Sequence, residues 1–144
     1  MDDDPDDPGQ PDGPGEPTFT VEATFTVDEA RALLAELRPA VDEFVRLRGA
    51  LTGAQHARAA GDEAVALPDL KAMEAHISEV VDRITARGIQ VKGFAPLLLD
   101  FPMWIGDRQL LLCWVEGEEE LGWWHDTAHG FAGRRPLAEL PQWE

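Results

Sequence analysis

Apolar residues recur at a helical spacing from Thr26 to about Ala59. Thr26 and Glu29 have the spacing of a capping box, in which each side chain binds a free backbone N–H at the start of a helix. Two apolar rows then repeat every seven positions, which predicts an amphipathic helix. Pro39 interrupts this stretch, and its ring and missing N–H predict a kink near Ala35 or two helices in tandem. The rows consist of Ala30, Leu37, Phe44 and Leu51, and of Leu33, Ala40, Leu47 and Ala54.

A second helix is predicted to begin near Pro68 or Asp69 and to end at Gly88. Gly88 can adopt the left-handed conformation that ends many helices, and Arg87 lies next to the negative helix end. Because the connection between the two helices is short, we expect an antiparallel helical hairpin over residues 26–88. The apolar stripe of the second helix consists of Leu70, Met73, Ile77, Val80, Val81 and Ile84.

From Ile89 onward the period of the pattern changes from about 3.6 to two, as in strands. "IQVKG" is a possible short strand, and "LLLDFPMWI", "QLLLCWV" and "LGWWHD" are clearer ones. Short turns separate these strands, and Gly106–Asp107 suits a two-residue hairpin turn. The pattern therefore predicts an α+β fold, with the helical hairpin packed on an antiparallel β-meander of three to four strands. The meander and a C-terminal segment occupy residues 89–144.

The turns also predict the register of the sheet. A turn at Gly106–Asp107 pairs Asp100 with Cys113, and a turn of two or four residues within 116–119 pairs Cys113 with Gly122. Side chains alternate between the two sides of a sheet. On this register Trp123 lies on the helix-facing side, with His125 at its rim, and Trp124 lies on the opposite side, which we call the Asp100 side.

The Asp100 side combines an acid, a thiol, aromatic rings and a glycine gap, so it is where we place a candidate binding surface. Two alternatives remain open: this side is an open pocket, or the final segment "GFAGRRPLAELPQW" folds over it. We favour the second alternative, in which the final segment covers this side. The candidate surface consists of Asp100, Cys113, Trp124, His125 and Arg134.

The sequence gives little support for three more specific functions: metal binding, thiol catalysis and phosphate binding. His125 and His129 have the spacing of a helical metal pair, but His125 ends a predicted strand and Gly130 follows His129. Cys113 and His125 lie on opposite sides in the predicted register, which argues against thiol catalysis. "GFAGRR" lacks the lysine of a phosphate-binding loop. We therefore expect neither a metal nor another cofactor, and we identify no catalytic residues.

Composition narrows the classes of partner. The net charge is −16, and residues 1–17 contain seven acidic and no basic side chains. Residues 1–23 are therefore expected to be a disordered acidic, proline-rich tail, followed by one α+β domain over residues 24–144. The remaining charge is still negative, so nucleic acid and anionic membranes are not expected as partners. Cys113 is the single cysteine, which suggests a cytoplasmic protein.

The segments "LLLDFP", "LLCWVEGEEELGWWHD" and "GFAGRRPL" together resemble a small bacterial family known as domain of unknown function 2203. The helix start "FTVDEARALLAELRP" also resembles the opening of that family, and the resemblance covers about Phe25 to Leu137. It implies no particular activity. The family pattern has positions matching Asp100, Cys113, Trp114, Gly122, Trp124, His125, Gly130, Phe131, Gly133 and Arg134.

These observations favour a cytoplasmic bacterial protein that acts as a non-catalytic binding or protein-interaction module. No nucleophile, base and orienting group are arranged as an enzyme would need them. We expect a protein partner or self-association, through the helices or the exposed side of the sheet. The alternative is a small-molecule-binding protein or enzyme with a site around Asp100, His125 and Arg134. Convergence of those three residues on an open pocket would favour this alternative, whereas burial in mutual pairs would argue against catalysis.

Overall fold

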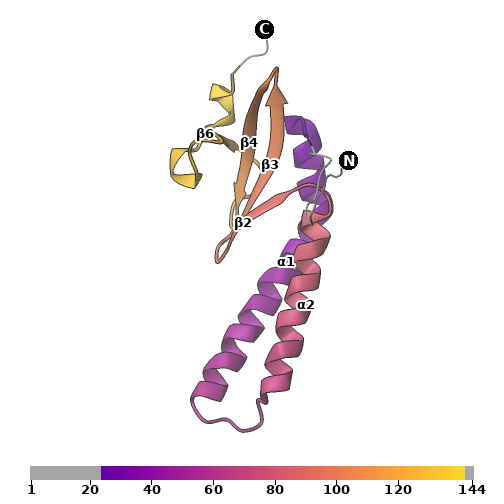
Figure 1. Cartoon of the computed structure of the whole chain (residues 1–144), viewed down its shortest axis with the longest axis vertical. Helices are drawn as coiled ribbons and strands as arrows, with labels where there is room; N and C mark the ends of the chain where they lie inside the picture. The colour runs from indigo at the N-terminus through magenta and orange to yellow at the C-terminus, as the bar shows by residue number, and fades with distance from the viewer. Residues whose placement is uncertain (1–23, 142–144) are drawn as a thin grey trace, which may run out of the picture.

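The computed structural model describes residues 24–141, and the predicted tail at residues 1–23 lies outside this range. The chain forms two helices followed by a five-stranded antiparallel sheet, which confirms the α+β fold (Figure 1). The sheet has one or two strands more than the pattern predicted. The elements in chain order are α1 (Val27–Ala59), α2 (Leu67–Thr85), β2 (Gln90–Phe94), β3 (Leu97–Ile105), β4 (Arg108–Val115), β5 (Trp123–Asp126), η1 (Phe131–Gly133), β6 (Arg135–Pro136) and η2 (Leu137–Glu139).

Helix α1 begins at the predicted capping box. The Thr26 side chain accepts a hydrogen bond from the Glu29 N–H at 3.1 Å, and the Glu29 carboxylate accepts one from the Thr26 N–H at 2.9 Å. The helix then continues through Pro39 to Ala59, so the prediction of two tandem helices is wrong. A proline inside a helix costs about 3 kcal/mol. Buried residues before and after Pro39, among them Leu37 and Val41, offset this cost.

Helix α2 also lies where the pattern placed it. Its first turn contains Pro68, and the Asp69 carboxylate accepts a hydrogen bond from the Ala66 N–H. Gly88 follows the helix with φ +94°, as predicted. The two helices run side by side as an antiparallel hairpin whose far end extends beyond the sheet (Figure 1). Among residues 24–141, no helix is both long and apolar enough to cross a membrane.

The strands lie in the order β2-β3-β4-β5-β6. The predicted β3–β4 register is confirmed, with Asp100 opposite Cys113 and Ile105 opposite Arg108. Gly106 has φ +65°, as a tight mirror-image turn requires. On the helix-facing side, the buried residues form one apolar core with both helices. Its largest fully buried side chains are Phe44, Val80, Ile84, Leu97, Leu99, Phe101, Leu110, Leu112, Trp114 and Leu121.

Three arginines of α1 attach the helix to the turn regions of the sheet. Arg31 donates two hydrogen bonds to the Leu121 carbonyl oxygen, at 3.0 and 3.1 Å. Arg38 donates to the carbonyl oxygens of Glu118 and Glu119. Arg48 donates to the Phe94 carbonyl oxygen at 2.6 Å. The polar edge of α1 therefore fixes the chain between β4 and β5.

Glu116 makes the best-connected of these attachments. Its two carboxylate oxygens each accept a hydrogen bond from Arg48 at 2.7 Å, and one of them also accepts the Leu97 N–H at 2.9 Å. The Arg48 guanidinium, followed by the Leu97 N–H, lowers the pKa of Glu116 from its usual 4.5 to about 2. Both side chains are about one quarter exposed, so solvent screens this pair only in part.

We predict that Glu116→Gln lowers the free energy of unfolding at pH 7 by about 2 kcal/mol, because it removes one charge of a partly buried ion pair. The folded pKa lies below the unfolded one. The ionised carboxylate therefore stabilises the fold above about pH 4.5, and this contribution is lost as the pH falls toward 2. Urea titrations between pH 2 and 7 should show a shallower acid decline for the variant.

The matched control is Glu36→Gln. Glu36 also pairs with an arginine, Arg87, at 2.6 Å, but on the exposed surface. Its substitution should leave the urea midpoint nearly unchanged. Equal effects of the two substitutions would contradict a special role for the Arg48–Glu116 pair.

Candidate functional site

The predicted register between β4 and β5 is wrong by one residue. Cys113 lies opposite Trp123, not Gly122, and Leu112 lies opposite Trp124. The loop between β4 and β5 contains seven residues, 116–122, an odd number, whereas the prediction assumed a turn of two or four. A shift of one residue moves every side chain of a strand to the other side of the sheet. The roles of the two tryptophans are therefore exchanged, and His125 moves to the Asp100 side.

Trp124 consequently leaves the candidate binding surface. It is buried in the apolar core on the helix-facing side, together with its cross-strand neighbour Leu112. Trp123 takes its place on the Asp100 side. The Arg134 guanidinium lies over the Trp123 ring, 4.5 Å from the ring centroid.

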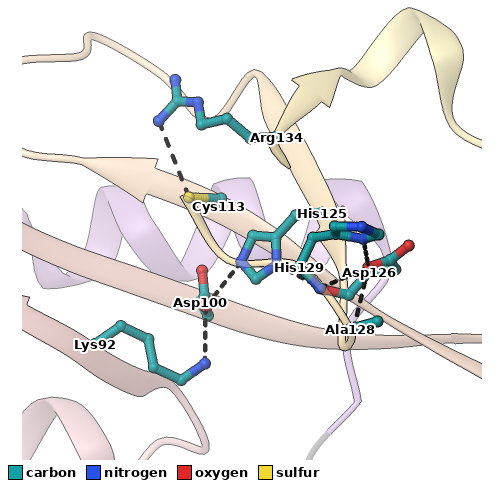
Figure 2. A network of polar contacts seen from close by, with 8 residues as sticks. All are labelled: Lys92, Asp100, Cys113, His125, Asp126, Ala128, His129 and Arg134. Atoms are coloured by element: carbon teal, nitrogen blue, oxygen red, sulfur yellow. Dashed lines mark hydrogen bonds and ion pairs between the residues drawn. The ribbon is translucent and has the colours of Figure 1, made fainter. Parts of the chain in front are cut away.

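The corrected register brings together Asp100, Cys113 and His125, from three adjacent strands (Figure 2). All three are buried, with at most 4% of each residue exposed. The His125 Nε2 atom lies 3.0 Å from the Asp100 Oδ2 atom. The same oxygen accepts a hydrogen bond from the Lys92 ammonium at 3.1 Å. Asp100 is thus the centre of a polar network on one side of the sheet.

The second ring nitrogen of His125 determines where a proton must lie. Nδ1 is 2.8 Å from the Asp126 carbonyl oxygen, which can only accept, so Nδ1 carries a hydrogen. A hydrogen bond between Nε2 and the Asp100 carboxyl group then requires a further proton between them. The pair is therefore an imidazolium–carboxylate pair or its neutral equivalent with a protonated acid. The hydrogen bond from Nδ1 to the Asp126 carbonyl oxygen also fixes the orientation of the His125 ring.

Cys113 is a thiol in this environment. Burial raises its pKa to about 12, and the negative charge of Asp100 adds to the effect, although Arg134 opposes it. The sulfur lies 3.9 Å from an Arg134 nitrogen. A thiol with this pKa is not an activated nucleophile at neutral pH. The predicted separation of Cys113 and His125 is wrong, yet the thiol remains unsuited to nucleophilic attack.

Arg134 joins the edge of the same cluster. It forms an ion pair with Glu118 in the β4–β5 loop, and its guanidinium also lies 4.6 Å from the centroid of the Phe131 ring. Glu118 in turn accepts the Val115 N–H at 2.9 Å. Arg134 is therefore positioned by aromatic rings and a carboxylate, and it approaches Cys113 rather than Asp100.

A cavity of about 430 Å³ opens beside these residues. The segment 127–131 forms its outer rim, while strands β6 and β5 pair at the sheet edge. Of the segment that was expected to fold over the Asp100 side, Gly130 and Phe131 line this cavity. The cavity is lined by Lys92, Leu98, Asp100, Leu111, Cys113, His125, Thr127, Ala128, His129, Gly130 and Phe131.

The two histidines four residues apart have separate roles. His129 Nδ1 lies 2.8 Å from the Asp126 carboxylate, which also accepts the N–H groups of Ala128 and His129 (Figure 2). This bond lowers the pKa of Asp126. Residues 127–129 form a turn, not a helix, so His125 and His129 do not share a helix face. The donor group that the structure brings together instead is Asp100, Cys113 and His125, whose donor atoms lie within 4.8 Å of one another.

Sequence reasoning missed two residues of the site, Lys92 and Glu118. Strand alternation in "IQVKG" was a usable signal for Lys92, because a strand paired with β3 places every second residue on the Asp100 side. The actual pairing contains an irregularity between Val91 and Gly93, next to this lysine. Glu118 was interpreted only as part of a turn, and no local pattern connects it to Arg134.

We predict that Cys113 reacts with iodoacetamide far more slowly in the folded protein than in urea at pH 7, because the buried thiol is protonated. The rate should rise steeply only as the pH approaches the raised pKa. Asp100→Asn, which removes the neighbouring charge, should increase the rate in the folded state. Rapid alkylation of the folded wild type at pH 7 would contradict this description.

Comparison with known proteins places the chain in a family. The family model described as "Uncharacterized conserved protein (DUF2203)" matches residues 23–137, well over half of the chain. No curated protein and no solved structure shows significant similarity to the chain. The matched range includes both helices, the whole of β2 to β6 and every residue of the polar network. The chain therefore belongs to the DUF2203 family.

Proposed function

We propose that the protein is a non-catalytic binding module whose ligand site is the cavity on the Asp100 side of the sheet. The observation that carries this proposal is the burial of Asp100 and His125 at the wall of a cavity of about 430 Å³. Burying a polar group costs free energy unless the group has a hydrogen-bond partner in the protein or a ligand. Small-ligand sites combine a few such groups with apolar walls. Here Leu98, Leu111 and Phe131 supply the apolar part.

Binding is favoured over catalysis by the state of the polar groups. The pKa of Cys113 is raised. Asp100 and His125 are hydrogen-bonded to each other, and Arg134 forms an ion pair with Glu118. An enzyme of the acyl-transfer type would need a nucleophile beside a free base and a separate donor for the developing charge. The cavity volume of about 430 Å³ fits a ligand of small-molecule size.

The proposal predicts that Ala128→Phe abolishes ligand binding without unfolding the protein. Ala128 is an exposed residue that lines the cavity, so a phenyl ring there occupies the outer part of the cavity and leaves the core intact. A small-fragment library screened by ligand-observed NMR should yield fragments that bind the wild type and lose at least tenfold in affinity with the variant. Fragments that bind both proteins equally would contradict the proposal.

A control variant separates the cavity from the surface. Ala72→Phe adds the same ring on an exposed position of α2, away from the sheet, and should leave fragment binding unchanged. Near-ultraviolet circular dichroism of the tryptophans should be the same for the wild type and both variants.

We also propose self-association, which one observation supports separately. Trp104 of β3 is 42% exposed on the Asp100 side of the sheet, and tryptophan is enriched at protein–protein interfaces. Light scattering coupled to size exclusion should show a dimer at high protein concentration and a monomer for Trp104→Gln. A wild type that remains monomeric at every concentration would contradict self-association and leave the ligand site untouched.

A further inference from the structure

The three buried donors on the Asp100 side are Asp100, Cys113 and His125, and the Asp100–His125 pair does not by itself need the thiol. Asp100 and His125 satisfy each other, and Lys92 donates a second hydrogen bond to Asp100. Cys113 adds a thiol to the same group, with its sulfur within 4.8 Å of the other two donor atoms. A purely structural pair would be served as well by an alanine or valine at that strand position. The thiol therefore points to a ligand that binds sulfur.

The donor set identifies the class of that ligand. An imidazole nitrogen, a thiolate sulfur and a carboxylate oxygen are together the ligands of zinc and related divalent transition metals. Magnesium and calcium prefer oxygen donors only. We infer that Asp100, Cys113 and His125 form a site for a divalent transition-metal ion of the zinc class. This departs from the sequence-based expectation that no metal binds.

The geometry is close to what such an ion requires. Zn–N bonds of about 2.0 Å and Zn–S bonds of about 2.3 Å separate tetrahedral donors by about 3.5 Å. Closing the present separation of up to 4.8 Å therefore takes about 1 Å of side-chain movement. The donors come from adjacent strands β3, β4 and β5, which hold their backbones in place. The hydrogen bond from His125 Nδ1 to the Asp126 carbonyl oxygen leaves Nε2 as the metal-facing nitrogen.

The Lys92 ammonium would compete with a metal ion for the Asp100 carboxylate. The ammonium lies 3.1 Å from the carboxylate, but the side chain is 45% exposed and can turn into solvent (Figure 2). Arg134 beside the sulfur favours the thiolate that a metal needs. Metal binding would then replace one ammonium and the protons of the thiol and of the Asp100–His125 pair. Three protein ligands would leave a fourth position, and because all three line the cavity, a small ligand there would have a coordination site.

This inference rests on the proposed ligand site and assigns its anchoring group. The test is a cobalt titration of tag-free, metal-free full-length protein, because Co²⁺ reports its ligands by absorbance. The expected result is one Co²⁺ per chain, with a near-ultraviolet thiolate-to-cobalt band that Zn²⁺ abolishes. Cys113→Ser should remove that band, and His125→Gln should weaken binding at least tenfold. A wild type without the thiolate band would overturn the inference.

Two further variants keep the test sharp. His129→Gln is the matched control: His129 lines the cavity but contributes no donor, so its cobalt affinity should equal that of the wild type. A loss as large as that of His125→Gln would overturn the proposed ligand set. Lys92→Gln alters an exposed side chain and should tighten cobalt binding roughly tenfold, since the competing ammonium is gone. This variant remains informative if substitutions of the buried donors prevent folding, and an unchanged or weaker affinity would count against displacement of Lys92.

Comparison with fragment binding distinguishes failure of this inference from failure of the proposed function. Ala128→Phe fills the outer cavity without touching the donors, so it should retain cobalt binding while losing fragment binding. Fragment binding by a wild type that takes up no cobalt would overturn the metal site alone. Cobalt binding without any fragment binding would support the metal site and contradict a small-molecule cavity.

Discussion

The site depends on how the loop 116–122 is held, because that loop sets the register of β5 against β4. Gly117 adopts φ +105°, and the Glu118 N–H donates to the Val115 carbonyl oxygen, which closes a four-residue turn at the start of this loop. The Trp114 indole N–H and Arg38 both donate to the Glu118 carbonyl oxygen. A loop one residue shorter would turn His125 toward the helices and leave Asp100 facing Lys92 alone. The helix α1, through its arginines, thus fixes the chemistry on the far side of the sheet.

Burial of an acid and a histidine on the Asp100 side is tolerable only because each has partners. Removing one member of a buried ion pair leaves an uncompensated charge at a cost of about 3–5 kcal/mol. Among residues 24–141, the side chains that donate hydrogen bonds to the Asp100 carboxylate are those of His125 and Lys92. Cys113 lies in the same low-polarity environment, and that environment keeps its thiol protonated. Burial on adjacent strands thus keeps the Cys113 thiol protonated and also holds the three donor residues close together.

Several parts of this protein could be predicted from the sequence with local rules. The capping box at Thr26, the extent of α1 and the left-handed Gly88 follow from short-range backbone hydrogen bonding. The β3–β4 hairpin was placed in the correct register because a two-residue turn leaves little freedom. The structure brings Asp100, Cys113, His125 and Arg134 together, although the predicted register had placed His125 at the rim of the helix-facing side, and it moves Trp124 into the core. Strand β6 was missed, since two residues carry no periodic signal.

By itself, the sequence determined the two helices, the strands β2 to β5, most of the apolar core and the presence of an acid, a thiol and a histidine on neighbouring strands. Hydrophobic period and turn residues act over a few positions, so they can be seen without a structure. Only the tertiary structure decided which side of the sheet His125 occupies. That choice depends on whether the β4–β5 loop has an odd or even number of residues. Contacts from Arg31 and Arg38, about 80 to 90 positions earlier in the chain, hold that loop, and no local pattern encodes such a contact.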